Sequence, residues 1–180
     1  DADGRVLAQD LVSALQVPPQ DNSSMDGYAV RCADVAAAGT TYGLPVSQRI
    51  PAGSEAQPLT SGTVARIFTG AGIPPGADAV VMQEQVQAQG DHVVLQHVPR
   101  PGEWIRRTGE DIVAGSTILA AGALLRAQDL GLAASIGRTS LRVRRRLRVA
   151  VFSTGDELVE PGAPAPAGKV FDANRAALVA

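Results

Sequence analysis

The sequence predicts a multidomain α+β protein, and three observations support this class. Between residues 28 and 98, short runs rich in valine and isoleucine are bounded by glycine or proline, which is typical of a β-rich module. Helical spacing of apolar residues is confined to 128–136 and 173–180. A run at 147–152 that is apolar except for Arg148 leads into Ser-Thr-Gly-Asp-Glu, the pattern of the first strand of a parallel α/β sheet. We therefore expect a domain boundary near Arg145.

The first half of the chain is expected to be extended and rich in turns. Residues 6–14 fit either a strand or a short helix, which the Pro18-Pro19 pair ends in both cases. A polar turn follows at 21–26, and an extended segment begins at Tyr28. Further strands are expected at 44–50, 63–68, 79–85 and 92–97, with a hairpin between 79–89 and 91–98 across Gly90-Asp91.

The second half mixes strand and helix signals. Residues 117–125 continue the strand pattern, and a helix is expected at 128–136, ended by Gly137. A second helix is expected from Ala173, with Asp172 as its N-cap, after an exposed proline-rich loop at 160–168. Six arginines lie between residues 138 and 148, and alternating apolar residues favour strands with a solvated arginine face over a phosphate-binding patch.

Composition excludes several classes of protein. The chain has 180 residues, 45% of them hydrophobic, and a net charge of -2, which indicates a folded core and no nucleic-acid partner. A single cysteine, Cys32, excludes an internal disulfide framework. No apolar run reaches the roughly 18 residues of a membrane helix, so we expect no membrane association and a cytoplasmic location.

Four polar loops are candidates for chemistry, each combining hydroxyls or arginines, glycine and carboxylates. They lie at 21–26, 69–76, 106–111 and 153–157. Glycine lets backbone amides approach an anion, and carboxylate oxygens suit Mg²⁺. An oxyanion held beside Mg²⁺ is the requirement of phosphoryl or nucleotidyl transfer. Each loop alone also fits an ordinary turn or helix cap, so the prediction depends on the four together.

Five ordered motifs carry a resemblance that covers essentially the whole chain. They are Asp-Asn-Ser-Ser-Met-Asp-Gly-Tyr-Ala-Val at 21–30, Thr-Gly-Ala-Gly-Ile-Pro-Pro-Gly-Ala-Asp-Ala-Val-Val-Met-Gln-Glu at 69–84, Arg-Arg-Thr-Gly-Glu-Asp-Ile at 106–112, Phe-Ser-Thr-Gly-Asp-Glu-Leu at 152–158 and Phe-Asp-Ala-Asn-Arg at 171–175. In this order they resemble the MoeA family of molybdopterin molybdenumtransferases, to which the C-terminal part of gephyrin also belongs.

The resemblance implies the last step of molybdenum cofactor synthesis. Family enzymes insert molybdate into the dithiolene of adenylylated molybdopterin and release AMP in the presence of Mg²⁺. They are homodimers with a shared active-site cleft, and a molybdopterin adenylyltransferase is the expected upstream partner. A non-catalytic, gephyrin-like dimeric scaffold and a tungstate-using paralogue are the alternatives, and the acidic and glycine loops favour the enzyme.

The resemblance also implies a domain plan. Residues 1–20 and 106–145 would form a discontinuous linking and dimerisation domain of mixed α/β structure, and 21–105 a β-rich domain inserted into it. Residues 146–180 would begin a molybdopterin-binding three-layer α/β domain. The family's later glycine-rich pterin-binding motif does not occur in these residues, so we expect this domain to be truncated and the 180 residues alone to be inactive.

The matching motifs also indicate which residues would be functional. The resemblance implies catalytic roles for Asp26, Thr69, Asp111 and Glu157, with Asp111 and Glu157 as metal ligands and Glu157 supplied by the opposite subunit. The substrate-binding residues that it implies are Ser24, Gly70, Arg106, Arg107, Ser153, Thr154, Gly155 and Asp156.

Overall fold

The computed structural model describes residues 2–39 and 41–180. Asp1, at the start of the predicted linking domain, and Thr40, within the predicted β-rich module, lie outside these ranges. Contacts divide the chain into two compact units, Asp1–Val143 and Arg144–Ala180, and each is considered by itself. The domain boundaries given above stay predictions.

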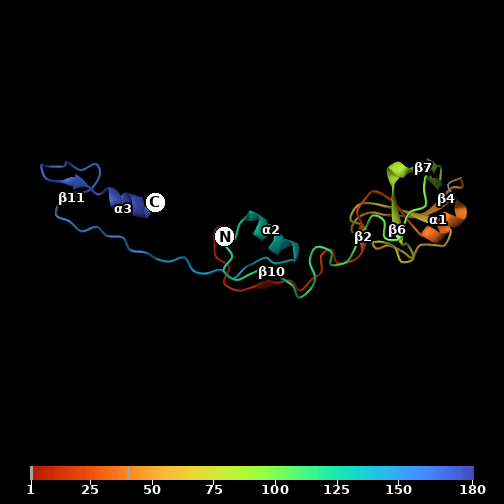
Figure 1. Cartoon of the computed structure of the whole chain (residues 1–180), viewed down its shortest axis with the longest axis horizontal. Coiled ribbons are helices and arrows are strands. Elements are labelled where there is room, and N and C mark those ends of the chain that lie inside the picture. Colours follow the sequence, from red (N-terminus) through yellow and green to blue (C-terminus); the bar gives the residue numbers. More distant parts are fainter. Residues whose placement is uncertain (1, 40) are drawn as a thin grey trace. The chain divides into compact units, whose positions relative to one another are not determined.

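A six-stranded sheet forms the larger part of the first unit (Figure 1). Its strands, in the spatial order β6-β3-β5-β4-β8-β7, are β6 (Ala79–Met82), β3 (Gly27–Val30), β5 (Val64–Ile67), β4 (Leu44–Ile50), β8 (His92–Leu95) and β7 (Val86–Gln89). The β4–β5 pair is parallel and the other neighbours are antiparallel. The predicted strands and the hairpin across Gly90 are confirmed, except that 79–85 ends as a strand at Met82 and continues as the 3-10 turn η1 (Gln83–Gln85).

The strands β3, β5 and β6 are largely buried on both faces of the sheet. Successive side chains of a strand point to opposite sides. Val30, Val64 and Val81 belong to the apolar cluster on one face. Ala29 and Val80, their neighbours in sequence, belong to the cluster on the other face. The burial of neighbouring side chains on different faces fixes the register of these strands.

The helix α1 (Cys32–Ala38) corrects the prediction that helices are confined to two places in the chain. This segment carries four alanines, and Asp34 lies in the first turn, where a carboxylate favours the helix dipole. Val35 is its one buried residue and packs in the same apolar cluster as Val30. The helix is short, so its apolar spacing gave no periodic signal.

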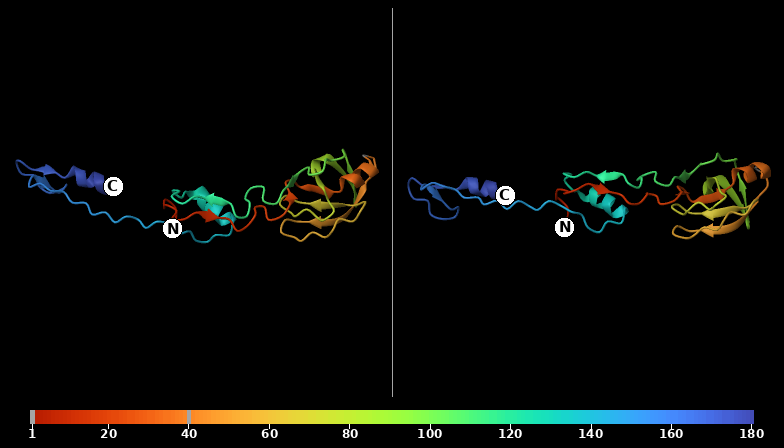
Figure 2. Two further views of the ribbon diagram at one scale, coloured as in Figure 1. Left: turned by 60° about the horizontal axis from the view of Figure 1, so that its bottom comes forward. Right: turned by 90° about the horizontal axis from the view of Figure 1, so that it is seen from below.

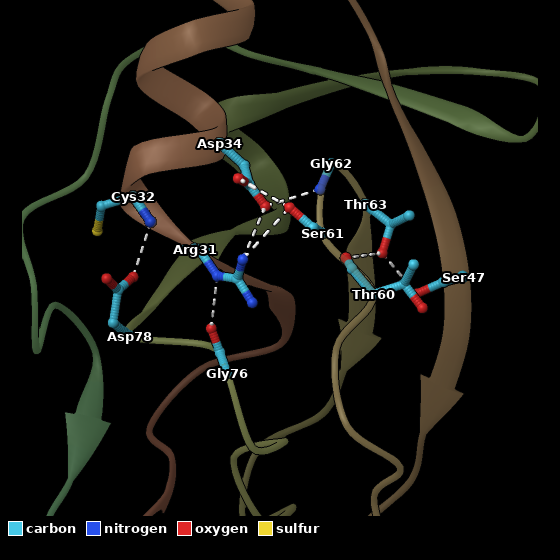
Figure 3. A network of polar contacts seen from close by, with 10 residues as sticks. All are labelled: Arg31, Cys32, Asp34, Ser47, Thr60, Ser61, Gly62, Thr63, Gly76 and Asp78. Carbon is cyan, nitrogen blue, oxygen red and sulfur yellow. Dashed lines mark hydrogen bonds and ion pairs between the residues drawn. The ribbon is translucent and has the colours of Figure 1, made fainter.

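Polar contacts attach the start of α1 to two loops of the sheet (Figure 3). The backbone N–H of Cys32 donates to Asp78 Oδ1 at 2.7 Å, and Arg31 Nε donates to the Gly76 carbonyl at 3.2 Å. Asp34 Oδ2 accepts from the Gly62 amide at 2.7 Å. The Asp78 carboxylate thus accepts from one of the N–H groups that a helix start leaves unpaired, and the other two contacts attach side chains of the helix start to the loops.

The remainder of the first unit combines its N-terminal segment with its C-terminal segment. Strands β1 (Leu11–Val12) and β10 (Thr117–Leu119) pair antiparallel, and α2 (Ala127–Ser135) lies alongside β10 (Figures 1 and 2). Leu7 and Leu11 share an apolar cluster with Ala133 and Ile136 of the α2 region. Residues 6–14 are thus extended, not helical, and the helix predicted at 128–136 is confirmed.

The second unit holds a parallel pair, β11 (Leu158–Val159) and β12 (Val170–Phe171), followed by α3 (Ala173–Val179). Asp172 caps α3 by accepting from the Arg175 amide at 3.0 Å, as predicted, and the loop 160–168 is exposed. The strand predicted at 147–152 is wrong for this structure, since no described residue pairs with it and Phe152 is 81% exposed. A lone strand leaves its backbone groups unpaired. Of the strands predicted in 141–149, only Val143 forms a bridge, to Leu7.

Within the described ranges, no helix is both long enough and apolar enough to cross a membrane.

Candidate functional site

Asp26 and Thr69 meet at one edge of the six-stranded sheet. Asp26 directly precedes β3, Thr69 follows β5, and these strands pair antiparallel with Gly27 opposite Ile67. Oδ1 of Asp26 accepts from both the backbone N–H and the hydroxyl of Thr69, each at 2.8 Å. The Thr69 amide is the main cause that lowers the pKa of Asp26 below its ordinary value. Asp26 Oδ2 has no hydrogen-bond partner in the part of the chain that the structure describes.

Gly27 is required where β3 begins. A Cβ at this position would lie 2.0 Å from the carbonyl oxygen of Val81 on β6, a distance that no side chain can adopt. Only glycine allows β3 to approach β6 this closely directly after Asp26, so the Asp-Gly sequence has a packing reason.

A second strand pair, β2 (Asn22–Ser23) with β9 (Ile105–Arg106), joins three of the predicted loops. Asn22 lies opposite Arg106 in this pair, and Asn22 also forms an isolated bridge with Gly72. The Gly70 amide donates to the Ser23 carbonyl at 2.8 Å. The loops at 21–26, 69–76 and 106–111 are therefore held next to one another by backbone hydrogen bonds.

The two serines of the polar turn have different surroundings. Ser23 is 1% exposed, and its hydroxyl donates to the Met25 carbonyl at 2.6 Å, which closes the turn. Ser24 is partly exposed, and its backbone N–H donates to the Trp104 carbonyl at 3.0 Å. The predicted substrate-binding role of Ser24 stays a prediction.

Arg106 and Asp111 form an ion pair at one side of this cluster. Arg106 Nη2 lies 2.5 Å from Asp111 Oδ2, and its Nε lies 3.8 Å from Glu110 Oε1. The hydrogen bond to Asp111 is the main reason why the pKa of Arg106 is raised. Half of the Asp111 side chain is exposed, so a ligand can reach the carboxylate.

Arg107 and Thr108 hold Asp21, a residue that the motif comparison did not place in the site. Arg107 Nη1 lies 2.7 Å from Asp21 Oδ2, while the Thr108 amide and hydroxyl donate to Oδ1 at 2.8 and 3.0 Å. The Thr108 amide is the largest cause that lowers the pKa of Asp21. No sequence signal pairs these residues, because more than 80 positions separate them.

In the second unit, the loop with Ser153, Thr154, Gly155, Asp156 and Glu157 borders an open hollow of about 420 Å³. The hollow itself is lined by Ser153, Thr154 and Asp172, among others. The Ser153 hydroxyl is the main cause that lowers the pKa of Asp172, followed by the Arg175 amide. The Glu157 carboxylate lies beside Gly155, where a Cβ would come within 2.6 Å of it. Lys169 Nζ donates to the Asp156 carbonyl.

The site contains carboxylates, the type of donor that a hard cation takes, although Asp111 and Glu110 are both paired with Arg106. Asp111 and Glu110 offer exposed carboxylate oxygens, the ligands that Mg²⁺ takes together with several waters. No group of three or more His, Cys, Asp or Glu side chains among the described residues is arranged to hold a metal ion. Asp111 and Glu157 belong to different units, so their joint role as metal ligands stays a prediction.

This arrangement defines a class: an α+β protein whose β-rich module brings glycine loops, carboxylates and guanidinium groups together at one edge of a sheet. The family model described as MoeA N-terminal region (domain I and II) matches residues 1–137. This chain belongs to the MoeA family, which confirms the resemblance stated above.

Similar proteins cover nearly all of this chain. The molybdopterin molybdenumtransferase of Haemophilus influenzae is 44% identical over 177 residues, which are 97% of this chain and 43% of that protein. Molybdopterin molybdenumtransferase 2 of Mycobacterium tuberculosis is 43% identical, over 99% of this chain and 45% of its own length. The crystal structure of the molybdopterin biosynthesis MoeA protein of Pyrococcus horikoshii OT3 matches with a TM-score of 0.90 and 36% identity, over 99% of this chain and 48% of that one. The chain thus spans less than half the length of these relatives.

Proposed function

We propose that this chain serves the insertion of molybdate into adenylylated molybdopterin, with Mg²⁺-dependent release of AMP. Its relatives carry the name molybdopterin molybdenumtransferase. The single observation that carries the proposal is the convergence of three motif loops at β2, where Asn22 pairs with Arg106 and Gly70 donates to Ser23. The reaction needs carboxylates and cationic groups together, and this cluster supplies both.

Each side chain has a role that its contacts support. The two Thr69 donors stabilise the charged form of Asp26, and its Oδ2 would accept a hydrogen bond from the substrate. Gly70, which follows Thr69, and Ser24 would contact the substrate from the same two loops. Arg106 and Arg107 supply guanidinium groups, and the planar fork of donors in such a group suits either the oxyanion or the pyrophosphate.

Asp111 and Glu157 would hold Mg²⁺, which neutralises negative charge on a pyrophosphate link when it is bound. The ion pair with Arg106 orients the Asp111 carboxylate before the substrate arrives. Ser153, Thr154, Gly155 and Asp156 would contact the pterin substrate from the loop that carries Glu157.

The proposed assembly is a cytoplasmic homodimer in which Glu157 of the partner subunit completes the site of Asp26, Thr69 and Asp111. A molybdopterin adenylyltransferase would supply the adenylylated substrate, because the pyrophosphate link must be formed before it is cleaved.

Alanine at Glu157 or Asp111 tests this proposal in the full-length protein. We expect molybdate-dependent AMP release to fall about 100-fold or more, while the dimer dissociates at the same protein concentration as the unchanged protein. Equal loss of activity and of dimer stability would make these residues structural. A folded dimer that binds the pterin and releases no AMP would favour a scaffold, and release that depends on tungstate and not on molybdate would favour the altered paralogue.

A further inference from the structure

Arg66 bridges the two strands from which Asp26 and Thr69 emerge. Its Nη1 donates to the carbonyl oxygens of Gly27 at 2.8 Å and of Ile67 at 3.0 Å. Gly27 follows Asp26 directly, and Ile67 lies two positions before Thr69. One guanidinium nitrogen therefore joins the first residue of β3 to the last residue of β5.

Two aromatic rings and an amide fix the orientation of the same guanidinium. Its carbon lies 4.4 Å from the centre of the Phe68 ring and 5.3 Å from that of Tyr28. Nη2 donates to Gln83 Oε1 at 2.6 Å. Tyr28 lies opposite Arg66 in the β3–β5 register, so these contacts follow from strand pairing. A planar group that is held on its face and its edge has little freedom to move.

Arg66 is only partly exposed, and no carboxylate of the described residues lies within ion-pair distance of it. A surface arginine commonly keeps its guanidinium group in water while its aliphatic part covers apolar surface. The contacts instead direct its donors to the backbone at the edge of the candidate site.

We propose that Arg66 is a positioning residue, which holds the ends of β3 and β5 together so that Thr69 donates both of its hydrogen bonds to Asp26. The effect of Arg66 on the Asp26–Thr69 pair does not depend on the proposed function. Its consequence for catalysis rests on the function proposed above.

Lysine cannot replace this arginine. An ammonium group keeps the positive charge but lacks the planar fork that reaches two carbonyls and an amide while it stacks on rings. Arg66→Lys therefore separates the geometric role of Arg66 from the role of its charge. The charge of Arg66 also lowers the pKa of Asp26, but less than the Thr69 donors do.

Arg49 provides a matched control. It lies opposite Arg66 in the β4–β5 register, and its guanidinium carbon lies 4.7 Å from the centre of the same Phe68 ring. In the described part of the chain it has no hydrogen bond to the strand ends. Arg49→Lys thus disturbs the same aromatic ring without touching the bridge.

The experiment is NMR on this chain, with two readouts: the pKa of the Asp26 carboxyl from its carbon shift, and hydrogen exchange of the Thr69 amide. In Arg66→Lys and Arg66→Gln we expect the Asp26 pKa to rise toward that of an unperturbed aspartate and Thr69 exchange to accelerate about tenfold. Arg49→Lys should leave both at their original values.

Two results would overturn the proposal. If Arg66→Lys changes neither readout while Arg66→Gln raises the Asp26 pKa, Arg66 acts by charge alone. If Arg49→Lys produces the same changes as Arg66→Lys, the effect is general packing. Should Arg66→Lys fail to fold, Arg66→Gln carries the test, since it removes the donors to both the Gly27 and the Ile67 carbonyls, and unchanged Thr69 exchange there would contradict the bridge.

Activity is measured separately in the full-length protein. We expect Arg66→Lys to lower kcat of molybdate-dependent AMP release about 10- to 100-fold with little change in KM. The reason is that misplacement of Asp26 and Thr69 weakens stabilisation of the transition state more than binding of the substrate. Altered NMR readouts with unchanged kcat would overturn the catalytic consequence alone. Absence of AMP release from the unchanged protein would overturn the proposed function and leave the NMR result standing.

Discussion

Asp21 connects the polar turn to the loop of Arg106 and Asp111 through one carboxylate. Three donors from Arg107 and Thr108 stabilise its charged form, so the pKa of Asp21 is lowered in the folded protein. Its contribution to stability is therefore complete above the unfolded pKa of about 3.9 and is lost as the pH falls through the folded pKa.

Asp21→Asn tests this linkage. We expect a loss of about 1 kcal/mol or less of unfolding free energy at pH 7, since the pair is partly exposed, and a difference from the unchanged chain that shrinks below about pH 4. Urea unfolding across pH 3–7 measures it. Asp91→Asn, at an exposed hairpin turn, is the control, and a difference that persists undiminished at pH 3 would contradict the linkage.

Cys32 should be an unreactive thiol. Desolvation, followed by the hydrogen bond and charge of Asp78, raises its pKa to about 12. Only about one Cys32 thiol in 10⁴ is then ionised at pH 8. We therefore expect Cys32 to react with a disulfide reagent roughly 10³-fold more slowly than free cysteine does. Reaction at the rate of free cysteine in the folded chain would contradict this environment.

At the residue scale, motifs predicted Asp26, Thr69, Arg106 and Asp111, and the structure brings Asp26 to Thr69 and Arg106 to Asp111. The motifs could not predict the partners of Asp21, because pairing across the chain depends on the β2–β9 register. The role of Arg66 was equally hidden, since a lone arginine in a strand is usually read as solvated.

At the scale of elements, α2 shows that the position of a glycine decides whether its replacement by alanine stabilises or destabilises the chain. The amides of Gly137 and Arg138 donate to the carbonyls of Ala134 and Ala133, and Gly137 has a φ of 76°. This geometry ends a helix with a left-handed residue, where glycine is preferred. Gly131, in the middle of the same helix, has ordinary helical geometry and open space around it.

Two alanine variants should then differ in sign. We expect Gly131→Ala to stabilise the chain by about 0.5–1 kcal/mol and Gly137→Ala to destabilise it by about 1 kcal/mol. Thermal and urea unfolding of both variants measure the effects, and each serves as control for the other. Changes of the same sign would contradict the assigned helix end.

The sequence predicted elements well where periodicity or turn residues are local, as in β4 and α2. It missed α1, whose seven residues bury one side chain and depend on Asp78 and Gly62 from other loops. It placed a strand at 147–152 from an apolar run, although a parallel strand needs a neighbour, and the parallel pair lies at β11 and β12 instead.

At the scale of the molecule, the first unit folds three distant segments into one cluster: the turn before β3, the loop after β5 and the segment after β9. Loops with the same polar composition gain a common function only through this convergence. The β2 strand is central to it, because its backbone contacts both other segments.

A double-mutant cycle on molybdate-dependent AMP release by the full-length protein tests this convergence most directly. Asp26→Asn and Asp111→Asn should each lower kcat/KM at least about tenfold, and the double variant should lose about tenfold less than the product of the two. Such non-additivity is expected of groups that act on one substrate in one site. Effects that multiply fully, or wild-type activity in either single variant, would contradict the account.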